Sequence, residues 1–282
     1  MINGEKIGVG ICTCTRPEMF KKLFDSLNDC SSIIDRLFIV KDSTENNDED
    51  YVTGLLDTWS GDAGKFISDK NMGVAKSKNL IFKDLMDSGC DHIFLIEDDI
   101  YIKNLKVFNE YIEASKVSGI QHFNFSQHGK MNKTFDNLSN PNPKILIDYG
   151  SIQIALYPHC VGAFSYYTSK SLQICGLMDE IFYNACEHLD HTFEIIEHGL
   201  HPPFWYFSDI QNSWDYLGDE EWSHEQSTIS VRFDRSSVIQ NSTRIFFKKR
   251  GINLSDIELT SDEDVISSLK NIKSKYAKNI SN

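Results

Sequence analysis

The chain has 282 residues, of which 28 are Lys or Arg and 41 are Asp or Glu, so its formal net charge is −13. The hydrophobic fraction of 40% is sufficient for a folded core and excludes a disordered chain. The acidic excess disfavours non-specific binding to nucleic acid, because the chain and the phosphate backbone repel each other.

The distribution of apolar and cysteine residues indicates where the protein works. No run approaches the roughly 20 apolar residues that a membrane span requires. The N-terminus lacks the basic region and apolar stretch of a signal peptide. The seven cysteines are scattered through apolar segments, which is typical of free thiols in a reducing compartment. We therefore expect a cytoplasmic protein without a membrane span; its oligomeric state stays open.

Strands and helices alternate in the first hundred residues. Short apolar runs at 7–14, 37–40 and 93–96 predict buried strands, and 65–68 predicts a further short strand. Helices are expected between them: one after a capping pair formed by Thr15 and Glu18, a weaker one over 52–59, and one that ends near Met86. This alternation predicts a mostly parallel α/β sheet flanked by helices, in which ligands bind beyond the carboxyl ends of the strands.

The pattern changes after Asn104. Apolar segments at 120–126 and 145–157 predict strands of a mixed or antiparallel region, and 201–222, which is rich in aromatic residues, reads as a lid or pocket wall. A last helix is expected after Ser261, with Val265, Leu269 and Ile272 on its apolar side.

The triplet Glu97-Asp98-Asp99 follows the apolar run at 93–96. Three adjacent carboxylates repel one another unless water or a cation neutralises them. Oxygen ligands of this kind suit Mg²⁺ or Mn²⁺, which usually bind substrate phosphates as well. The alternative is a solvated acidic turn.

Four blocks, in order, carry a resemblance to a known family. They are the first strand with Thr13 to Glu18, the second strand with Asp42-Ser43, the segment 71–79, and the strand that ends in the acidic triplet. Together they resemble the nucleotide-sugar-binding half of GT-A fold glycosyltransferases of the family 2 type. The resemblance implies a GT-A, Rossmann-like sheet, a mixed acceptor-side region and a helical C-terminal tail.

The resemblance also implies roles for individual residues. Asp99 would bind the metal directly, and Asp42 would accept a hydrogen bond from the nucleotide base. Other residues would line the nucleotide and diphosphate pocket: Thr13, Thr15, Arg16, Asn71, Gly73, Lys76, Asn79 and Asp98. A downstream histidine is often a further metal ligand in relatives; His224 is the candidate here and His201 its competitor.

A helix predicted over 186–198 is the candidate catalytic element. Its apolar face would carry Leu189, Phe193 and Ile196, and its polar face Glu187, Asp190, His191 and Glu194. Many relatives carry an acidic pair at the start of such a helix, whereas Glu187 is followed here by His188. The general base is therefore expected to be Asp190 or Glu187, with His188 third; the alternative is a charged, solvent-facing helix.

These observations and the resemblance predict a metal-dependent glycosyltransferase that transfers a sugar from a nucleotide-sugar donor to an acceptor hydroxyl. The resemblance implies a UDP-sugar as the donor and inversion at the anomeric carbon. Expected boundaries are 1–104 for the donor half, 105–235 for the acceptor and catalytic half, and 236–282 for the tail. The acceptor is open: a glycan, lipid-linked sugar, protein or modified nucleobase. Alternatives are a non-catalytic sugar-binding module and a sugar-phosphate nucleotidyltransferase, although the latter usually has a glycine-rich phosphate loop that Thr13 to Pro17 lacks.

Overall fold

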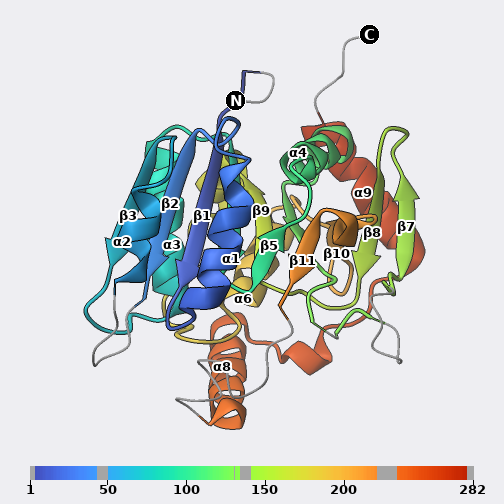
Figure 1. The fold of residues 1–282 in the computed structure, drawn as a ribbon. Coiled ribbons are helices and arrows are strands. Elements are labelled where there is room, and N and C mark those ends of the chain that lie inside the picture. The colour runs from blue at the N-terminus through green and yellow to red at the C-terminus, as the bar shows by residue number, and fades with distance from the viewer. Residues whose placement is uncertain (1–3, 43–49, 130, 134–140, 221–233, 278–282) are drawn as a thin grey trace.

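The computed structural model describes residues 4–42, 50–129, 131–133, 141–220 and 234–277 (Figure 1). Its central sheet has six strands in the order β3-β2-β1-β4-β9-β6. The bounds of these strands in chain order are β1 Ile7–Thr13, β2 Arg36–Lys41, β3 Ala63–Ile67, β4 His92–Glu97, β6 His122–Asn124 and β9 Phe164–Thr168. Each strand predicted in the first hundred residues is therefore present, and the mostly parallel α/β architecture is confirmed.

The parallel half of the sheet is covered on both faces. β1 pairs in parallel with β2 and with β4, and helices α1 (Pro17–Asn28), α2 (Tyr51–Leu56) and α3 (Val74–Asp87) connect the strands. The core forms two clusters: Phe20 and Phe24 of α1 belong to one, and Ile81 and Phe82 of α3 to the other. Gly10 of β1 allows close packing of α3, because a Cβ there would lie 1.9 Å from Ile81 Cγ2.

The central sheet becomes antiparallel at β9. Ile96, near the end of β4, pairs with Phe164, the first residue of β9, and His92 pairs with Thr168 at the other end. The start of β9 therefore lies at the same edge as the carboxyl ends of β1, β2 and β4. This edge carries Thr13, Asp42 and the acidic triplet, as the parallel pattern predicts.

Two smaller sheets complete the structure. β7 (Ile145–Asp148), β8 (Gln153–Tyr157) and β10 (Phe207–Ile210) form an antiparallel sheet, and β5 (Ile100–Ile102) pairs with β11 (Leu217–Asp219). The prediction that 201–222 lacks regular structure is thus wrong, since it contains β10, η1 (Ser213–Asp215) and β11. Phe204, Tyr206 and Phe207 are buried there, so they pack in the interior.

The remaining helices surround the second half of the chain. They are α4 (Val107–Ser118), α5 (Ser169–Cys175), α6 (Glu187–Glu197), α8 (Arg235–Arg250), the short η2 (Leu254–Asp256) and α9 (Asp262–Tyr276). Ser261 caps α9 by accepting a hydrogen bond from the Asp264 backbone N–H, and Val265, Leu269 and Ile272 are buried, as predicted. α9 packs against α4, whereas α8 extends below the body of the molecule in Figure 1.

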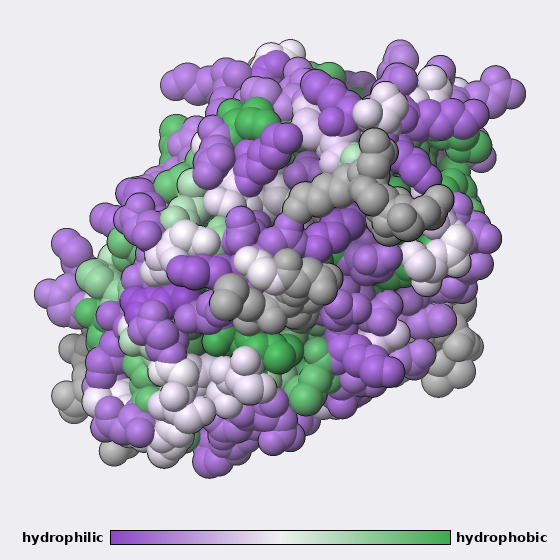
Figure 2. Space-filling view, turned by 90° about the horizontal axis from the view of Figure 1, so that it is seen from above, coloured by the Kyte–Doolittle hydropathy of each residue, from purple (hydrophilic) through white to green (hydrophobic). Residues whose placement is uncertain are grey.

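Other local expectations have different outcomes. The predicted Thr15–Glu18 capping pair is not formed: the N-cap of α1 is Arg16, whose guanidinium has no acceptor atom for a cap and instead pairs with Asp98 and Asp99. All seven cysteines are free thiols. In the described ranges, no helix has both the length and the apolar character needed to cross a bilayer. Hydrophilic side chains dominate the face seen in Figure 2, with small apolar patches between them.

Candidate active site

At the carboxyl ends of β1 and β4, two buried aspartates lie beside the guanidinium of Arg16. Asp98 and Asp99 follow β4 and are 1% and 3% exposed. The Thr13 hydroxyl donates to Asp98 Oδ2 at 2.7 Å. The Arg16 guanidinium, from the loop after β1, forms ion pairs with Asp98 and with Asp99 Oδ2, the latter at 3.1 Å. The structure therefore brings together four residues that the sequence assigns to the donor site.

The electrostatics of this cluster favour additional positive charge. Burial raises the pKa of Asp98, Arg16 opposes the rise, and the neighbouring charge of Asp99 adds to it, so that the pKa reaches about 6. Asp99 Oδ1 is buried and has no hydrogen-bond partner among the residues that the structure describes. A buried oxygen without a partner is costly, and a divalent cation with its bound phosphates would satisfy it.

The residues present fit a cation that is completed by substrate. Within the described ranges, no group of three or more His, Cys, Asp and Glu side chains has the arrangement of a metal site. Mg²⁺ and similar ions are often held by one or two carboxylates, with substrate phosphates and water as the other ligands. Asp99, supported by Asp98, suits this mode. The predicted ligand His224 lies outside the described residues.

His128, which the sequence analysis missed, lies close enough to Asp99 to be affected by its charge. His128 Nδ1 is 3.4 Å from Asp219 Oδ2, and Asp219 is in β11, next to Glu220, whose N–H donates to the Asp99 carbonyl at 2.8 Å. Burial lowers the pKa of His128, but the contact with Asp219 and the charge of Asp99 outweigh burial and raise it. No local motif marks His128, because the β5–β11 pairing that places Asp219 here spans more than a hundred residues.

Asp42 organises the segment before α3. Its carboxylate accepts hydrogen bonds from the backbone N–H groups of Met72 at 2.7 Å and Gly73 at 3.1 Å. Gly73 has a φ of +87°, and a Cβ there would lie 2.6 Å from the Tyr183 ring, so this position requires glycine. The Tyr183 hydroxyl donates to Asn71 Oδ1 at 2.6 Å. Asp42, Asn71 and Gly73 thus form one unit, and the base contact of Asp42 stays a prediction.

The other predicted pocket residues lie apart. Thr15 and Lys76 are exposed. Asn79 is buried and exchanges two hydrogen bonds with the Met178 backbone, its Nδ2 donating to the carbonyl at 2.8 Å and its Oδ1 accepting from the N–H at 3.0 Å. Asn79 therefore anchors the segment that leads to α6.

Lys78 joins the acidic triplet to α6. Its Nζ lies 2.7 Å from Glu97 Oε1 and 3.0 Å from Glu187 Oε1, and its side chain is 0% exposed. Burial lowers the pKa of Lys78, but the two carboxylates raise it well above its usual range, so the ammonium is charged. The sequence analysis chose the exposed Lys76 instead. The missed signal is spacing: Lys78 shares the apolar stripe of α3 with Ala75, Phe82 and Leu85.

The first half of the polar face of α6 is buried, contrary to the solvent-facing alternative, whereas Glu194 is partly exposed. Glu187, Asp190 and His191 are 2–3% exposed. Glu187 contacts Lys78 and His188. Asp190 Oδ1 accepts from Arg250 Nε at 2.8 Å, and its Oδ2 accepts from Lys249 Nζ at 2.7 Å.

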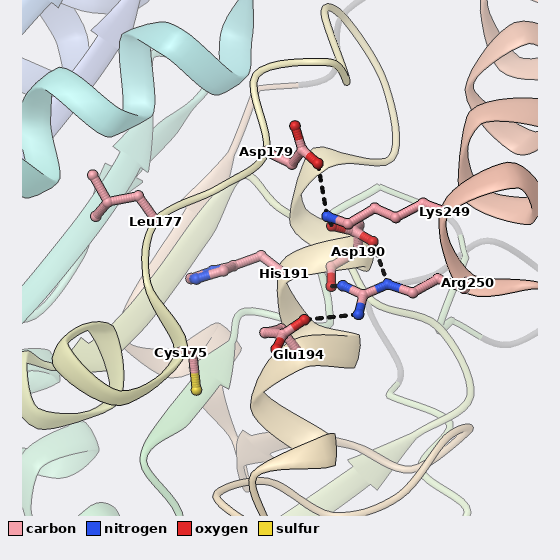
Figure 3. A pocket seen from close by; sticks show the side chains of 8 residues that line it. All are labelled: Cys175, Leu177, Asp179, Asp190, His191, Glu194, Lys249 and Arg250. Atoms are coloured by element: carbon pink, nitrogen blue, oxygen red, sulfur yellow. Dashed lines mark hydrogen bonds and ion pairs between the residues drawn. The ribbon is translucent and has the colours of Figure 1, made fainter.

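A pocket lies between α6 and α8 (Figure 3). It is lined by Asp190, Lys249 and Arg250 together with Asp179, Glu194, His191, Cys175 and Leu177. Lys249 also pairs with Asp179 at 2.8 Å, and Arg250 with Glu194 at 2.7 Å. Lys249 and Arg250, two of the three cations in the basic run at 248–250, are thus paired with carboxylates. These ion pairs therefore hold α8 against α6.

His201, the competitor of His224, lies in the interior. Its Nδ1 donates to the Pro202 carbonyl at 2.7 Å and its Nε2 accepts from the Ser208 N–H at 3.3 Å. Both ring nitrogens are therefore engaged by the backbone, which leaves none for a metal.

Comparisons with known proteins agree with this architecture. No family model matches the chain. An uncharacterized glycosyltransferase, R363 of Acanthamoeba polyphaga mimivirus, is 29% identical over 247 residues, which span 82% of this chain and 88% of that protein. The crystal structure of residues 1–349 of S. aureus TarS in complex with UDP is 10% identical with a TM-score of 0.52, covering 95% of this chain and 80% of that one.

The chain has the GT-A fold of glycosyltransferases. The same TarS fragment in complex with UDP-GlcNAc aligns with a TM-score of 0.51 at 11% identity, over 95% of this chain and 80% of that one. In this GT-A fold, the acidic triplet ends β4 and α6 follows β9, the order that the resemblance implied. The mimivirus relative and the fold together support a glycosyltransferase.

Proposed function

We propose that this GT-A protein transfers a sugar from a nucleoside diphosphate sugar, with a UDP-sugar as the donor class, to an acceptor hydroxyl with inversion and with help from Mn²⁺ or Mg²⁺. The observation that carries the proposal is the buried Asp98–Asp99 pair at the end of β4, in which Asp99 Oδ1 lacks a hydrogen-bond partner within the described ranges. A solvated acidic turn would not bury both carboxylates.

The chain's own residues account for the donor site. Asp99 and Asp98 would hold the cation, which when bound supplies positive charge to the departing diphosphate. Arg16 lies between β1 and these aspartates, where it adds a fixed positive charge close to the phosphates. Asp42 fixes the 71–73 segment, which would form the wall beside the base and ribose.

Three segments of the chain would have different roles. We propose that residues 1–104 bind the donor, that 105–235 bind the acceptor and include α6, and that the tail from 236 supports them through α8 and α9. The pairs between α8 and Asp190 support the last assignment. Direct attack of the acceptor hydroxyl on the anomeric carbon would invert the configuration of that carbon.

The test is thermal stability of the purified protein with UDP, GDP and CMP and with their sugar conjugates, each with Mn²⁺ or with EDTA. We expect one nucleotide class to raise the Tm in a Mn²⁺-dependent manner, because a ligand that binds only the folded state stabilises it. Asp99→Ala should abolish the shift, and Asp87→Ala, an exposed aspartate at the end of α3, should retain it. A shift unchanged in Asp99→Ala contradicts the proposed site.

A measurement of UDP release distinguishes an enzyme from a non-catalytic binding module of the same fold. An enzyme should release UDP from its donor in the presence of Mn²⁺, with water or an added hydroxyl compound as acceptor. Binding of the donor without release of UDP under any of these conditions would instead support the non-catalytic module.

A further inference from the structure

Three acidic or basic side chains at the start of α6 differ sharply in their access to a substrate. The side chains of Glu187 and Asp190 are 4% and 3% exposed, and each is paired with a cation. The His188 side chain is 25% exposed. A base must reach the acceptor hydroxyl, so access favours His188.

His188 also lies beside the strand that carries the acidic triplet. A Cβ on Gly162 would be 2.9 Å from His188 Cγ, so the imidazole packs directly on the backbone at Gly162. The next residue, Ala163, accepts a hydrogen bond from the Glu97 N–H at 2.7 Å. The ring is therefore held at the edge of the sheet where the donor site lies.

Glu187 fixes the tautomer of this ring. Burial would raise the pKa of Glu187, but Lys78 and His188 lower it far below its usual range, so the side chain is a carboxylate. A carboxylate only accepts hydrogen bonds. His188 Nδ1, which lies 3.2 Å from Glu187 Oε1, must then carry the hydrogen, and Nε2 of the neutral ring has the free lone pair.

We propose that His188 is the general base of the transfer reaction and that Glu187, held by Lys78, is its positioning residue. This inference rests on the proposed function. His188 Nε2 removes the proton of the acceptor hydroxyl as that oxygen forms a bond to the anomeric carbon. The bond from this carbon to the diphosphate oxygen breaks, the nucleoside diphosphate leaves with the electron pair, and Glu187 stabilises the imidazolium.

The assignment replaces the order of candidates drawn from the sequence, in which Asp190 and Glu187 preceded His188. Asp190 binds Lys249 and Arg250 of α8, and Glu187 binds Lys78, so taking up a proton would cost each carboxylate its ion pairs. His188 loses no such pair on protonation, because its partner Glu187 is negative.

The first test measures UDP release from UDP-GlcNAc, UDP-glucose and UDP-galactose with Mn²⁺ in four proteins: wild type, His188→Asn, Glu187→Gln and His198→Asn. His198 is the matched control, since it is an exposed histidine at the other end of α6 that contacts Glu194. Asparagine keeps an N–H near the position of Nδ1 but has no base at Nε2. We expect kcat to fall about 10²–10⁴-fold in His188→Asn, with KM for the donor unchanged, and to be unchanged in His198→Asn.

Three further readouts distinguish a base from a structural role. Imidazole added to His188→Ala should restore part of kcat, and Glu187→Gln should lower kcat without altering the Mn²⁺-dependent Tm shift by UDP. The ¹⁵N spectrum of the wild type should show the Nδ1–H tautomer for the signal that disappears in His188→Asn. An Nε2–H tautomer, or full activity of His188→Asn, would overturn the assignment.

The outcomes also separate this inference from the function on which it rests. If UDP raises the Tm and the wild type releases UDP, but His188→Asn does so equally, only the base is wrong. If the wild type neither binds nor turns over any nucleotide, the glycosyltransferase proposal itself fails, and the inference fails with it.

Discussion

Lys78 Nζ lies 3.0 Å from Glu187 Oε1, although 109 residues separate the two in the chain. α3 follows the segment anchored by Asp42, and α6 carries the proposed base, so this contact couples the proposed donor-binding half to the helix of the proposed base. A fully buried ammonium between two carboxylates is stabilising only as a complete set. Replacement of Lys78 is therefore expected to affect both the stability of the fold and the position of the proposed base.

Lys78→Met should destabilise the fold by about 3–5 kcal/mol, because it leaves Glu97 and Glu187 without their counter-charge. Urea denaturation measures the loss. Lys76→Met, an exposed position on the same helix, should change the free energy of unfolding by less than about 0.5 kcal/mol. If Lys78→Met does not fold, Lys78→Gln provides the measurement; equal stability of the Lys76 and Lys78 variants would show that the buried pair contributes nothing.

Asp190 and Arg250 should be strongly coupled. A double-mutant cycle with Asp190→Asn and Arg250→Gln should give an interaction free energy of about 1–3 kcal/mol, because Asp190 is buried and its Oδ1 accepts from the guanidinium. Lys21 and Asp25, an exposed pair one turn apart on α1, should give only about 0.3–0.5 kcal/mol. Similar values for the two cycles would mean that α8 is not held through Asp190.

Gly73→Ala should destabilise the protein by about 1–3 kcal/mol and weaken nucleotide binding. Its backbone has a φ of +87°, and the new Cβ would lie 2.6 Å from both the Tyr183 ring and the Tyr183 carbonyl oxygen. Gly54→Ala in α2 has no atom within 4 Å and should instead stabilise by about 0.5–1 kcal/mol. Denaturation curves of both variants test the contrast, which a tolerated Gly73→Ala would refute.

His201 should make the fold sensitive to acid. Burial lowers its pKa to about 4, despite the hydrogen bond to Pro202, whereas the unfolded chain has the ordinary value of about 6.5. Between these values the unfolded state binds more protons, so stability is full above the unfolded pKa and is lost as the pH falls towards 4. From pH 7 to 5, the wild type should lose about 2 kcal/mol more than His201→Gln.

The comparison with His201→Gln isolates this histidine. Burial raises the pKa of Asp98 to about 6 and that of Asp209 to about 7, and both carboxyl groups act in the opposite direction over the same pH range. Since both are present in the two proteins, their contributions cancel in the difference. Parallel pH profiles of wild type and variant would show that His201 titrates normally.

The first half of the fold could be predicted from the sequence because its signals are local. The runs at 7–14 and 93–96 are apolar without interruption, as strands covered on both faces must be, and polar residues mark where they end. Parallel strands with helical connections then place Thr13, Asp42 and Asp98 at one edge. The same reasoning found the capped helix α9, whose apolar stripe is regular.

The helix α6 was predicted from its periodicity, but the burial of Glu187 and Asp190 on it could not be predicted in this way. Its apparent solvent face is buried because Lys249 and Arg250 of α8 neutralise Asp190 from 59 and 60 residues away. Periodicity records polarity, but it does not record whether a distant cation covers a polar face. Lys78 was missed for the same reason: a charge in an apolar stripe is interpretable only when its partners are known.

The reversal of direction at β9 brings the chain into the central sheet at the edge where the parallel strands end. β1, β2 and β4 end at the site, whereas β9 begins there, so the chain reaches the site through Gly162 and Ala163 before it enters the sheet. Under the proposed function, substitutions at Gly162 and Ala163 would alter the acceptor side, whereas the contacts of Asp42 with the 71–73 segment would be unchanged. A family of such proteins could therefore diversify its acceptors while keeping one donor.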